Sequence, residues 1–222
     1  MKKIYVLSVG PGSPAYLTPA VRDAAMECDL LVGGRRNLAL FEGSGQEMLE
    51  ISGKLAPLFA AVNERVASQR IGFLVSGDAG IFSILPRLVE GFGRENLVVF
   101  PGISAAQYLM AKLGLCWQEA RFISLHGRET ADLDAQLGEL YPLVVFTDSR
   151  NNPGYLCRLM IEAGFNNKKV YIGENLSYPD EKISAGRPQD FTGFNGSDLN
   201  LVVIMDGCAK QSLAVLAGES PD

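Results

Sequence analysis

The chain has 222 residues, of which 47% are hydrophobic and 20% charged, and its formal net charge is −5 at pH 7. This composition is ordinary for a globular protein with one large or two small domains. The negative charge and the aromatic content of 9% argue against a nucleic-acid binder that relies on a basic surface. No apolar run reaches the roughly 20 residues that span a membrane, and the start of the chain has no signal-peptide pattern. We therefore expect a cytoplasmic protein.

The few cysteines and the single histidine form no recognisable metal-binding pattern. The chain has 4 cysteines and 1 histidine, and no two cysteines form a C-x-x-C pair. The cysteines are Cys28, Cys116, Cys157 and Cys208. We expect reduced thiols, as in a cytosolic protein, and no bound metal.

The chain opens with a pattern that predicts a strand, a glycine-rich turn and a helix. Ile4–Val9 has the length and the β-branched content of a buried strand, and Gly10–Gly12 (Gly-Pro-Gly) ends it abruptly. Thr18 is a typical N-cap, and Pro19 is favoured at the first position of a helix. The dinucleotide-binding fingerprint does not fit, because its third glycine is replaced by Ala15. By itself, Gly-Pro-Gly is equally consistent with a simple strand terminator.

The residues up to position 113 continue to alternate between helix and strand. We expect helices at 18–27, 38–41, 55–68, 82–92 and 105–113, and strands at 29–34, 70–75 and 97–100. Two of these strands also end in turns rich in glycine, Ser76–Gly80 and Pro101–Ser104. We call Gly10–Gly12, Ser76–Gly80 and Pro101–Ser104 the first, second and third elbow. Because such alternation implies parallel strands, the elbows should share one sheet edge and form the floor of a binding cleft.

A second α/β unit follows a short linker. We predict an N-terminal domain at 1–113, a linker at 114–120 and a C-terminal domain at 121–222, each with a mostly parallel sheet and flanking helices. The expected strands are 121–125, 141–146 and 169–172, and helices are expected near 133–140 and from Asn152 to Gly164. Ile183 and Ser184 are expected to begin a hairpin with Asn200–Met205, and the last dozen residues to be a frayed tail.

The three elbow motifs carry a family resemblance. GPGSPAYLT, SGDAG and PGIS, in this order, resemble the tetrapyrrole methylases over about residues 3–207. The resemblance implies two α/β domains, S-adenosylmethionine (SAM) as methyl donor, a tetrapyrrole substrate and a homodimer. Alternatives are a methyltransferase of the same fold with another ring position or a non-tetrapyrrole substrate, and a non-catalytic SAM-binding module.

A narrower resemblance concerns one branch of this family. DLLVGGRRNLALF, GLCWQEARFISLHGR and ENLSYPDE are similar to the branch that methylates C5 of cobalt-precorrin-7 in cobalamin biosynthesis. Ala79 and Cys116 stand where that branch often has proline. The branch is sometimes fused to a decarboxylating C15-methyltransferase, so the resemblance makes a separate C15 enzyme a possible partner of this chain.

The resemblance also assigns site residues. Those implied to contact SAM are Pro11, Ser76, Gly77, Asp78, Ile81, Ser104, Ala105, Phe146, Asn175 and Leu176. His126 and Arg128 are candidates for binding the substrate, and the alternative is a structural role at a strand end.

Other residues keep two interpretations. Asp78 either accepts hydrogen bonds from SAM and complements its sulfonium charge, or caps its own turn. Arg35 and Arg36 either bind substrate carboxylates or are surface charge. No Ser-His-Asp set is recognisable, so the catalytic residues stay unassigned; methyl transfer requires chiefly that the reacting atoms are positioned in line.

Overall fold

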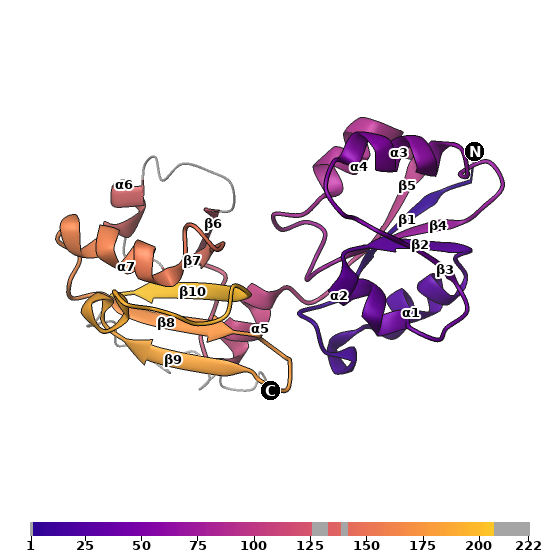
Figure 1. Ribbon diagram of the computed structural model, residues 1–222. Helices are drawn as coiled ribbons and strands as arrows, with labels where there is room; N and C mark the ends of the chain where they lie inside the picture. Colours follow the sequence, from indigo (N-terminus) through magenta and orange to yellow (C-terminus); the bar gives the residue numbers. More distant parts are fainter. Residues whose placement is uncertain (1, 126–132, 139–141, 207–222) are drawn as a thin grey trace, which may run out of the picture. The chain divides into compact units, whose positions relative to one another are not determined.

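The computed structural model describes residues 2–125, 133–138 and 142–206, which form two compact units (Figure 1). The first unit runs to Leu115 and also includes Asn175–Glu181. The second comprises Cys116–Glu174 and the described chain from Lys182 onward. The segment Asn175–Glu181 thus interrupts the second unit in sequence but packs with the first. The domain boundaries expected above stay a prediction.

The first unit is built on an all-parallel sheet of five strands in the order β3-β2-β4-β1-β5. Its strands are β1 (Ile4–Ser8), β2 (Leu30–Gly33), β3 (Glu47–Glu50), β4 (Ile71–Val75) and β5 (Leu97–Phe100). Because β1 pairs with both β4 and β5, the three strands that end in elbows are neighbours. The expectation that the elbows share one edge of one sheet is confirmed.

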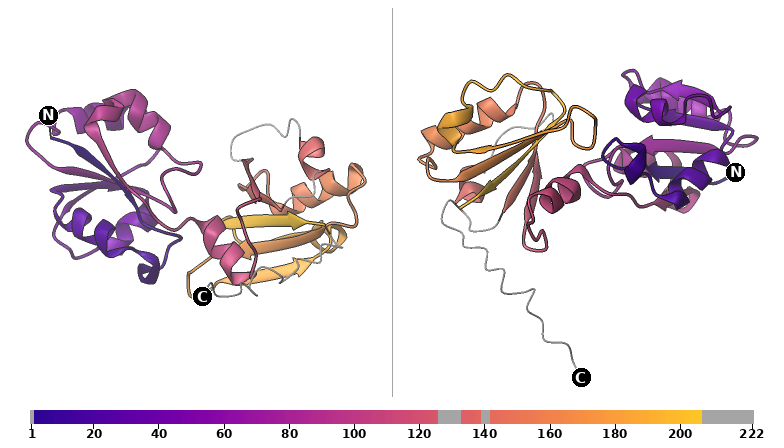
Figure 2. Two further views of the ribbon diagram at one scale, coloured as in Figure 1. Left: turned by 180° about the vertical axis from the view of Figure 1, so that it is seen from behind. Right: turned by 90° about the horizontal axis from the view of Figure 1, so that it is seen from below.

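Helices cover both faces of this sheet (Figures 1 and 2). The helical segments are η1 (Pro14–Tyr16), α1 (Pro19–Met26), α2 (Arg35–Leu38), η2 (Ala39–Phe41), α3 (Leu55–Asn63), α4 (Leu85–Phe92), η3 (Arg94–Asn96) and α5 (Ala105–Lys112). Alternate strand residues supply two cores. Ile4, Val6 and Phe73 pack with α3 and α4, whereas Leu7 and Leu31 pack with α1 and η2. Such two-sided burial explains the continuous apolar runs in the central strands.

The helix ends follow from local chemistry. Thr18 caps α1 by accepting a hydrogen bond from the backbone N–H of Val21 (3.3 Å). The helix expected from Phe82 begins later, at Leu85, because Phe82 has a left-handed backbone (φ 44°) that no α-helix accommodates. Strand β3 was not predicted, since its residues Glu-Met-Leu-Glu are half exposed at a sheet edge and lack the apolar content of the other strands.

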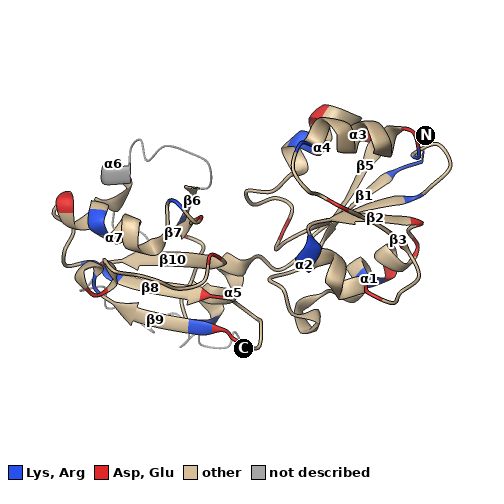
Figure 3. Ribbon diagram, in the orientation of Figure 1, with Lys and Arg blue, Asp and Glu red and all other residues tan. Residues whose placement is uncertain are grey.

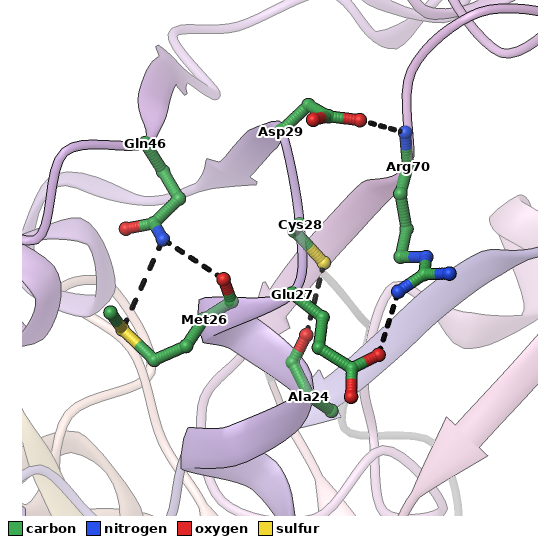
Figure 4. A network of polar contacts seen from close by, with 7 residues as sticks. All are labelled: Ala24, Met26, Glu27, Cys28, Asp29, Gln46 and Arg70. Carbon is green, nitrogen blue, oxygen red and sulfur yellow. Dashed lines mark hydrogen bonds and ion pairs between the residues drawn. The ribbon is translucent and has the colours of Figure 1, made fainter.

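A polar network secures the opposite, amino-terminal edge of this sheet (Figure 4). Asp29 Oδ2 accepts a hydrogen bond from the backbone N–H of Arg70 (2.7 Å), and the Arg70 guanidinium pairs with Glu27 (2.7 Å). Gln46 donates to the Met26 carbonyl oxygen (3.3 Å). These residues precede β2, β3 and β4, so they stabilise the sheet at a distance from the elbows.

The second unit contains a mixed sheet of five strands in the order β6-β7-β10-β8-β9. Its strands are β6 (Arg121–Ser124), β7 (Leu143–Phe146), β8 (Lys169–Glu174), β9 (Lys182–Gly186) and β10 (Asn200–Met205), and its helical segments are α6 (Leu133–Leu137), α7 (Pro153–Glu162) and η4 (Pro188–Phe191). Helices α6 and α7 cover one face, through Leu137, Leu156 and Met160. Among the described residues, no helix has both the length and the apolar character needed to cross a membrane.

Two expectations for the second unit are wrong. Its sheet is not mostly parallel, because β6 and β7 are the one pair of neighbouring strands that is parallel, whereas β10 is antiparallel to both β7 and β8, and β8 is antiparallel to β9. The hairpin expected between Ile183 and β10 is instead a β8–β9 hairpin. Strand β10 is apolar and almost wholly buried, which explains its central position, whereas the half-exposed β9 takes the edge.

Candidate active site

The first and second elbows are joined directly by their backbones. The N–H of Gly77 donates to the Gly10 carbonyl oxygen (2.7 Å), and the N–H of Gly10 donates to the Gly77 carbonyl oxygen (3.2 Å). Both glycines have left-handed φ angles, +80° at Gly10 and +67° at Gly77, which residues with a side chain rarely adopt. Glycine is therefore required here for the two strand ends to meet.

The Asp78 carboxylate joins the second elbow to the third. Its Oδ1 accepts a hydrogen bond from the backbone N–H of Gly80 (2.7 Å), and its Oδ2 accepts one from the backbone N–H of Gly102 (2.9 Å). The first bond is the turn-capping role considered above, and the second connects a different strand end. A direct contact between Asp78 and SAM stays a prediction.

Two further residues at this edge were not singled out from the sequence. Ser8 is fully buried at the end of β1, and its Oγ accepts a hydrogen bond from the backbone N–H of Ala79 (2.9 Å). A Cβ at Gly102 would lie 2.6 Å from the Gly77 carbonyl oxygen and 2.7 Å from Ser8. The signal for Ser8 was available, because it is the one small polar residue in a strand that otherwise consists of Ile, Tyr, Val and Leu.

The second elbow is also tied to α2. Ser76 Oγ donates to Asn37 Oδ1 (3.0 Å), and Asn37 Nδ2 donates to the Leu74 carbonyl oxygen (3.2 Å). Helix α2 follows the carboxyl end of β2, and it places the positive charges of Arg35 and Arg36 at the same edge as the elbows (Figure 3). Both arginine side chains are exposed.

The third elbow leads into α5 through a capping box. Ser104 Oγ accepts from the backbone N–H of Gln107 (3.0 Å), and the Gln107 side chain accepts from the backbone N–H of Ser104 (2.9 Å). Ser104 is buried, whereas Ala105 is partly exposed. The predicted start of this helix is confirmed.

The segment Asn175–Glu181, which we call the strap, contacts the first elbow. Ser177 Oγ accepts a hydrogen bond from the backbone N–H of Ser13 (2.9 Å), which directly follows that elbow. The Tyr178 ring lies so close to Gly12 that a Cβ there would overlap it. Leu176 in the strap is buried, with 4% of its surface exposed. Two predicted cofactor contacts, Asn175 and Leu176, therefore belong to the unit that carries the elbows.

The remaining predicted site residues are placed as follows. Pro11 and Ile81 are partly exposed, in the first elbow and directly after the second. Phe146 ends β7 in the second unit, where it pairs with Leu201. His126 and Arg128 lie outside the described residues. Among the residues that the structure does describe, no three His, Cys, Asp or Glu side chains form a group that could hold a metal ion.

Comparison with known proteins identifies the family. The model of the tetrapyrrole (corrin/porphyrin) methylases matches residues 3–191. The chain belongs to the tetrapyrrole methylase family. It is 33% identical over 202 residues to the cobalt-precorrin-7 C(5)-methyltransferase of Salmonella typhimurium, and the alignment covers 90% of this chain and 98% of that protein.

Solved structures agree with this family assignment at the level of the fold. The methyltransferase CobJ superposes with a TM-score of 0.79 at 18% identity, over 93% of this chain and 95% of that one. Uroporphyrin-III C-methyl transferase from Thermus thermophilus, solved in complex with S-adenosylhomocysteine, has a TM-score of 0.74 at 20% identity, over 91% and 92% of the two chains. The fold expected from the resemblance, with two α/β units, is confirmed; the mixed second sheet is the one departure.

Proposed function

We propose that this chain is a SAM-dependent C-methyltransferase that methylates C5 of cobalt-precorrin-7 in cobalamin biosynthesis. The observation that carries the proposal is the 33% identity to a C(5)-methyltransferase over 98% of that protein's length. The three elbows at one sheet edge support it, because ligands of open α/β sheets bind beyond the carboxyl ends of the strands.

The residues at this edge fit SAM by their chemistry. The elbows contain no lysine or arginine, and they contribute the Asp78 carboxylate, serine hydroxyls and backbone carbonyl groups as acceptors. A ligand with a sulfonium cation, an ammonium group and ribose hydroxyls needs such acceptors. Ile81, which is partly exposed, adds apolar surface that suits an adenine ring. SAM when bound supplies an activated methyl group, which is the chemically difficult part of the reaction.

The protein's own contribution is placement. We propose that Pro11, Ser76, Gly77 and the other predicted contacts hold the donor, and that the bonds among the elbows keep those contacts fixed before binding. Alignment of reacting atoms at about 3–3.5 Å is worth roughly 7–11 kcal/mol of the barrier in favourable cases. Phe146 stays a candidate for binding the cofactor. His126 and Arg128 stay candidates for binding the substrate.

We further propose that Arg35 and Arg36 bind carboxylates of the substrate. Corrin precursors carry several acetate and propionate side chains, and guanidinium groups pair with carboxylates in a bidentate geometry. Both arginines are exposed at the edge that carries the elbows, and α2 is fixed there through Asn37. We also propose that the protein is a cytoplasmic homodimer. A separate decarboxylating C15-methyltransferase is its proposed partner.

The decisive test is incubation of the protein with SAM and cobalt-precorrin-7, followed by mass spectrometry and by carbon NMR of a product labelled at the methyl group. We expect S-adenosylhomocysteine and a methyl group at C5. A methyl group on another ring carbon would point to a different member of the family. Tight SAM binding without turnover of any tetrapyrrole would favour a non-catalytic module and refute the proposal.

A further inference from the structure

The strap has an unusual backbone for residues that carry side chains. Asn175 (φ 47°) and Ser177 (φ 69°) both lie in the left-handed region, two residues apart. Such conformations persist only where the surroundings hold them, and they gather at ligand sites. The strap is therefore a segment whose shape depends on its contacts.

Glu181 supplies the main contacts that hold this shape. Its Oε2 accepts a hydrogen bond from the backbone N–H of Ser177 (2.6 Å), which closes the strap on itself. Its Oε1 lies 3.4 Å from Lys112 Nζ, and its carboxylate also accepts a hydrogen bond from the Tyr108 hydroxyl. Lys112 and Tyr108 both belong to α5, which directly follows the third elbow. One carboxylate thus fastens the strap to the helix beside the site.

The electrostatics of this cluster favour the ionised form of Glu181. Partial burial opposes ionisation, but the hydrogen bonds from Tyr108 and Ser177 and the charge of Lys112 outweigh it and lower the pKa of Glu181. Burial and the hydrogen bond to Glu181 raise the pKa of Tyr108 to about 12, so the phenol remains a donor. The Tyr108 ring is fixed by edge-to-face packing on Tyr16, with 4.9 Å between ring centroids.

We propose that Glu181 is a positioning residue for the cofactor, because it holds the strap in the conformation that places Asn175 and Leu176 beside the first elbow. Glu181 itself does not touch the ligand; it acts through Ser177, whose Oγ accepts from the backbone N–H of Ser13. The inference rests on the proposed function, since it assigns the strap to SAM binding.

The experiment compares Glu181→Ala with the matched variant Glu27→Ala. Glu27 also pairs with a basic side chain, Arg70, but at the amino-terminal edge of the same sheet (Figure 4). Calorimetry with S-adenosylhomocysteine measures affinity, steady-state kinetics separates KM for SAM from kcat, and hydrogen exchange reports on the peptide that contains the strap. We expect Glu181→Ala to weaken affinity about tenfold, with KM raised more than kcat is lowered, and to speed exchange in the strap.

Two conservative variants keep the test decisive if Glu181→Ala folds poorly. Glu181→Gln retains one acceptor oxygen, so its affinity should lie between that of Glu181→Ala and that of the wild type. Tyr108→Phe removes only a hydroxyl, so it should also weaken the affinity, but by less than Glu181→Ala does. Glu27→Ala should match the wild type in affinity and in strap exchange.

Unchanged strap exchange in the Glu181 variants would overturn the positioning role. Faster exchange in the strap together with wild-type affinity for S-adenosylhomocysteine would show that the strap does not contribute to cofactor binding. That result would also overturn the positioning role. A wild-type protein that fails to bind S-adenosylhomocysteine would instead refute the cofactor proposal, and the exchange data would still decide whether Glu181 holds the strap.

Discussion

The Asp78 carboxylate offers the sharpest test of how the elbows are organised. In Asp78→Ala, the backbone N–H groups of Gly80 and Gly102 lose their acceptor. A hydrogen bond to a charged group contributes about 1.5–3 kcal/mol, and because Asp78 is partly exposed, water replaces some of this; we expect a loss of about 2–4 kcal/mol in the free energy of unfolding. Since folded proteins are stable by about 5–15 kcal/mol, the variant should stay folded.

Binding should suffer together with stability, because the third elbow is released from the second. We expect the affinity for S-adenosylhomocysteine, measured by calorimetry, to fall about tenfold or more, and urea unfolding to report the stability loss. Asp78→Asn keeps one acceptor oxygen, so its affinity and its stability should both lie between those of Asp78→Ala and those of the wild type.

The control for this prediction is Asp29→Ala. It removes a carboxylate that also accepts a backbone N–H, that of Arg70, but at the far edge of the sheet. It should lower stability and leave affinity unchanged. If Asp78→Ala matched the wild type in both measurements, the carboxylate would not organise the elbows, and the reasoning would fail.

Three other predictions concern the same unit. Gly102→Ala should destabilise by about 1–3 kcal/mol in urea unfolding, because its Cβ would meet backbone 2.6 Å away; Gly34→Ala, with open space around it, should have little effect. Tyr108 holds its proton more tightly in the folded protein (pKa about 12) than when unfolded (10.0), so its contribution to stability is complete below pH 10 and is lost towards pH 12; Tyr108→Phe should remove this slope. The double variant Arg35→Gln/Arg36→Gln should raise KM for the tetrapyrrole and leave the affinity for S-adenosylhomocysteine unchanged.

The first unit could be predicted well from the sequence because its signals are local. Buried parallel strands are continuous apolar runs, and the turns after them need glycine, so both the strands and the elbows are visible as residue patterns. Capping residues such as Thr18 and Ser104 then mark the helix starts. Strand β3 lacked such a signal, since a half-exposed edge strand has no apolar run.

The second sheet and the bonds of the site could not be predicted in the same way. Strand pairing in a mixed sheet depends on contacts between distant segments. The apolar run of β10 is consistent with a central strand, but no local pattern indicates that its neighbours are β7 and β8 or that it runs antiparallel to both. The candidate residue Asp78 was identified from its motif, but its bond to Gly102 joins residues 24 positions apart. The cluster around Glu181 was missed because its members come from α5 and the strap, and no spacing rule connects them.

The strap also has a consequence for how the protein is made. The bond between Ser13 and Ser177 spans 164 positions, so most of the chain must leave the ribosome before the first unit can complete its contacts. The β-strands and helices of residues 2–115 can form early, but the strap, which packs against the first elbow of this unit, is synthesised only between β8 and β9. Nascent chains halted before Glu181 should therefore be incompetent for the cofactor, however well their first sheet has folded.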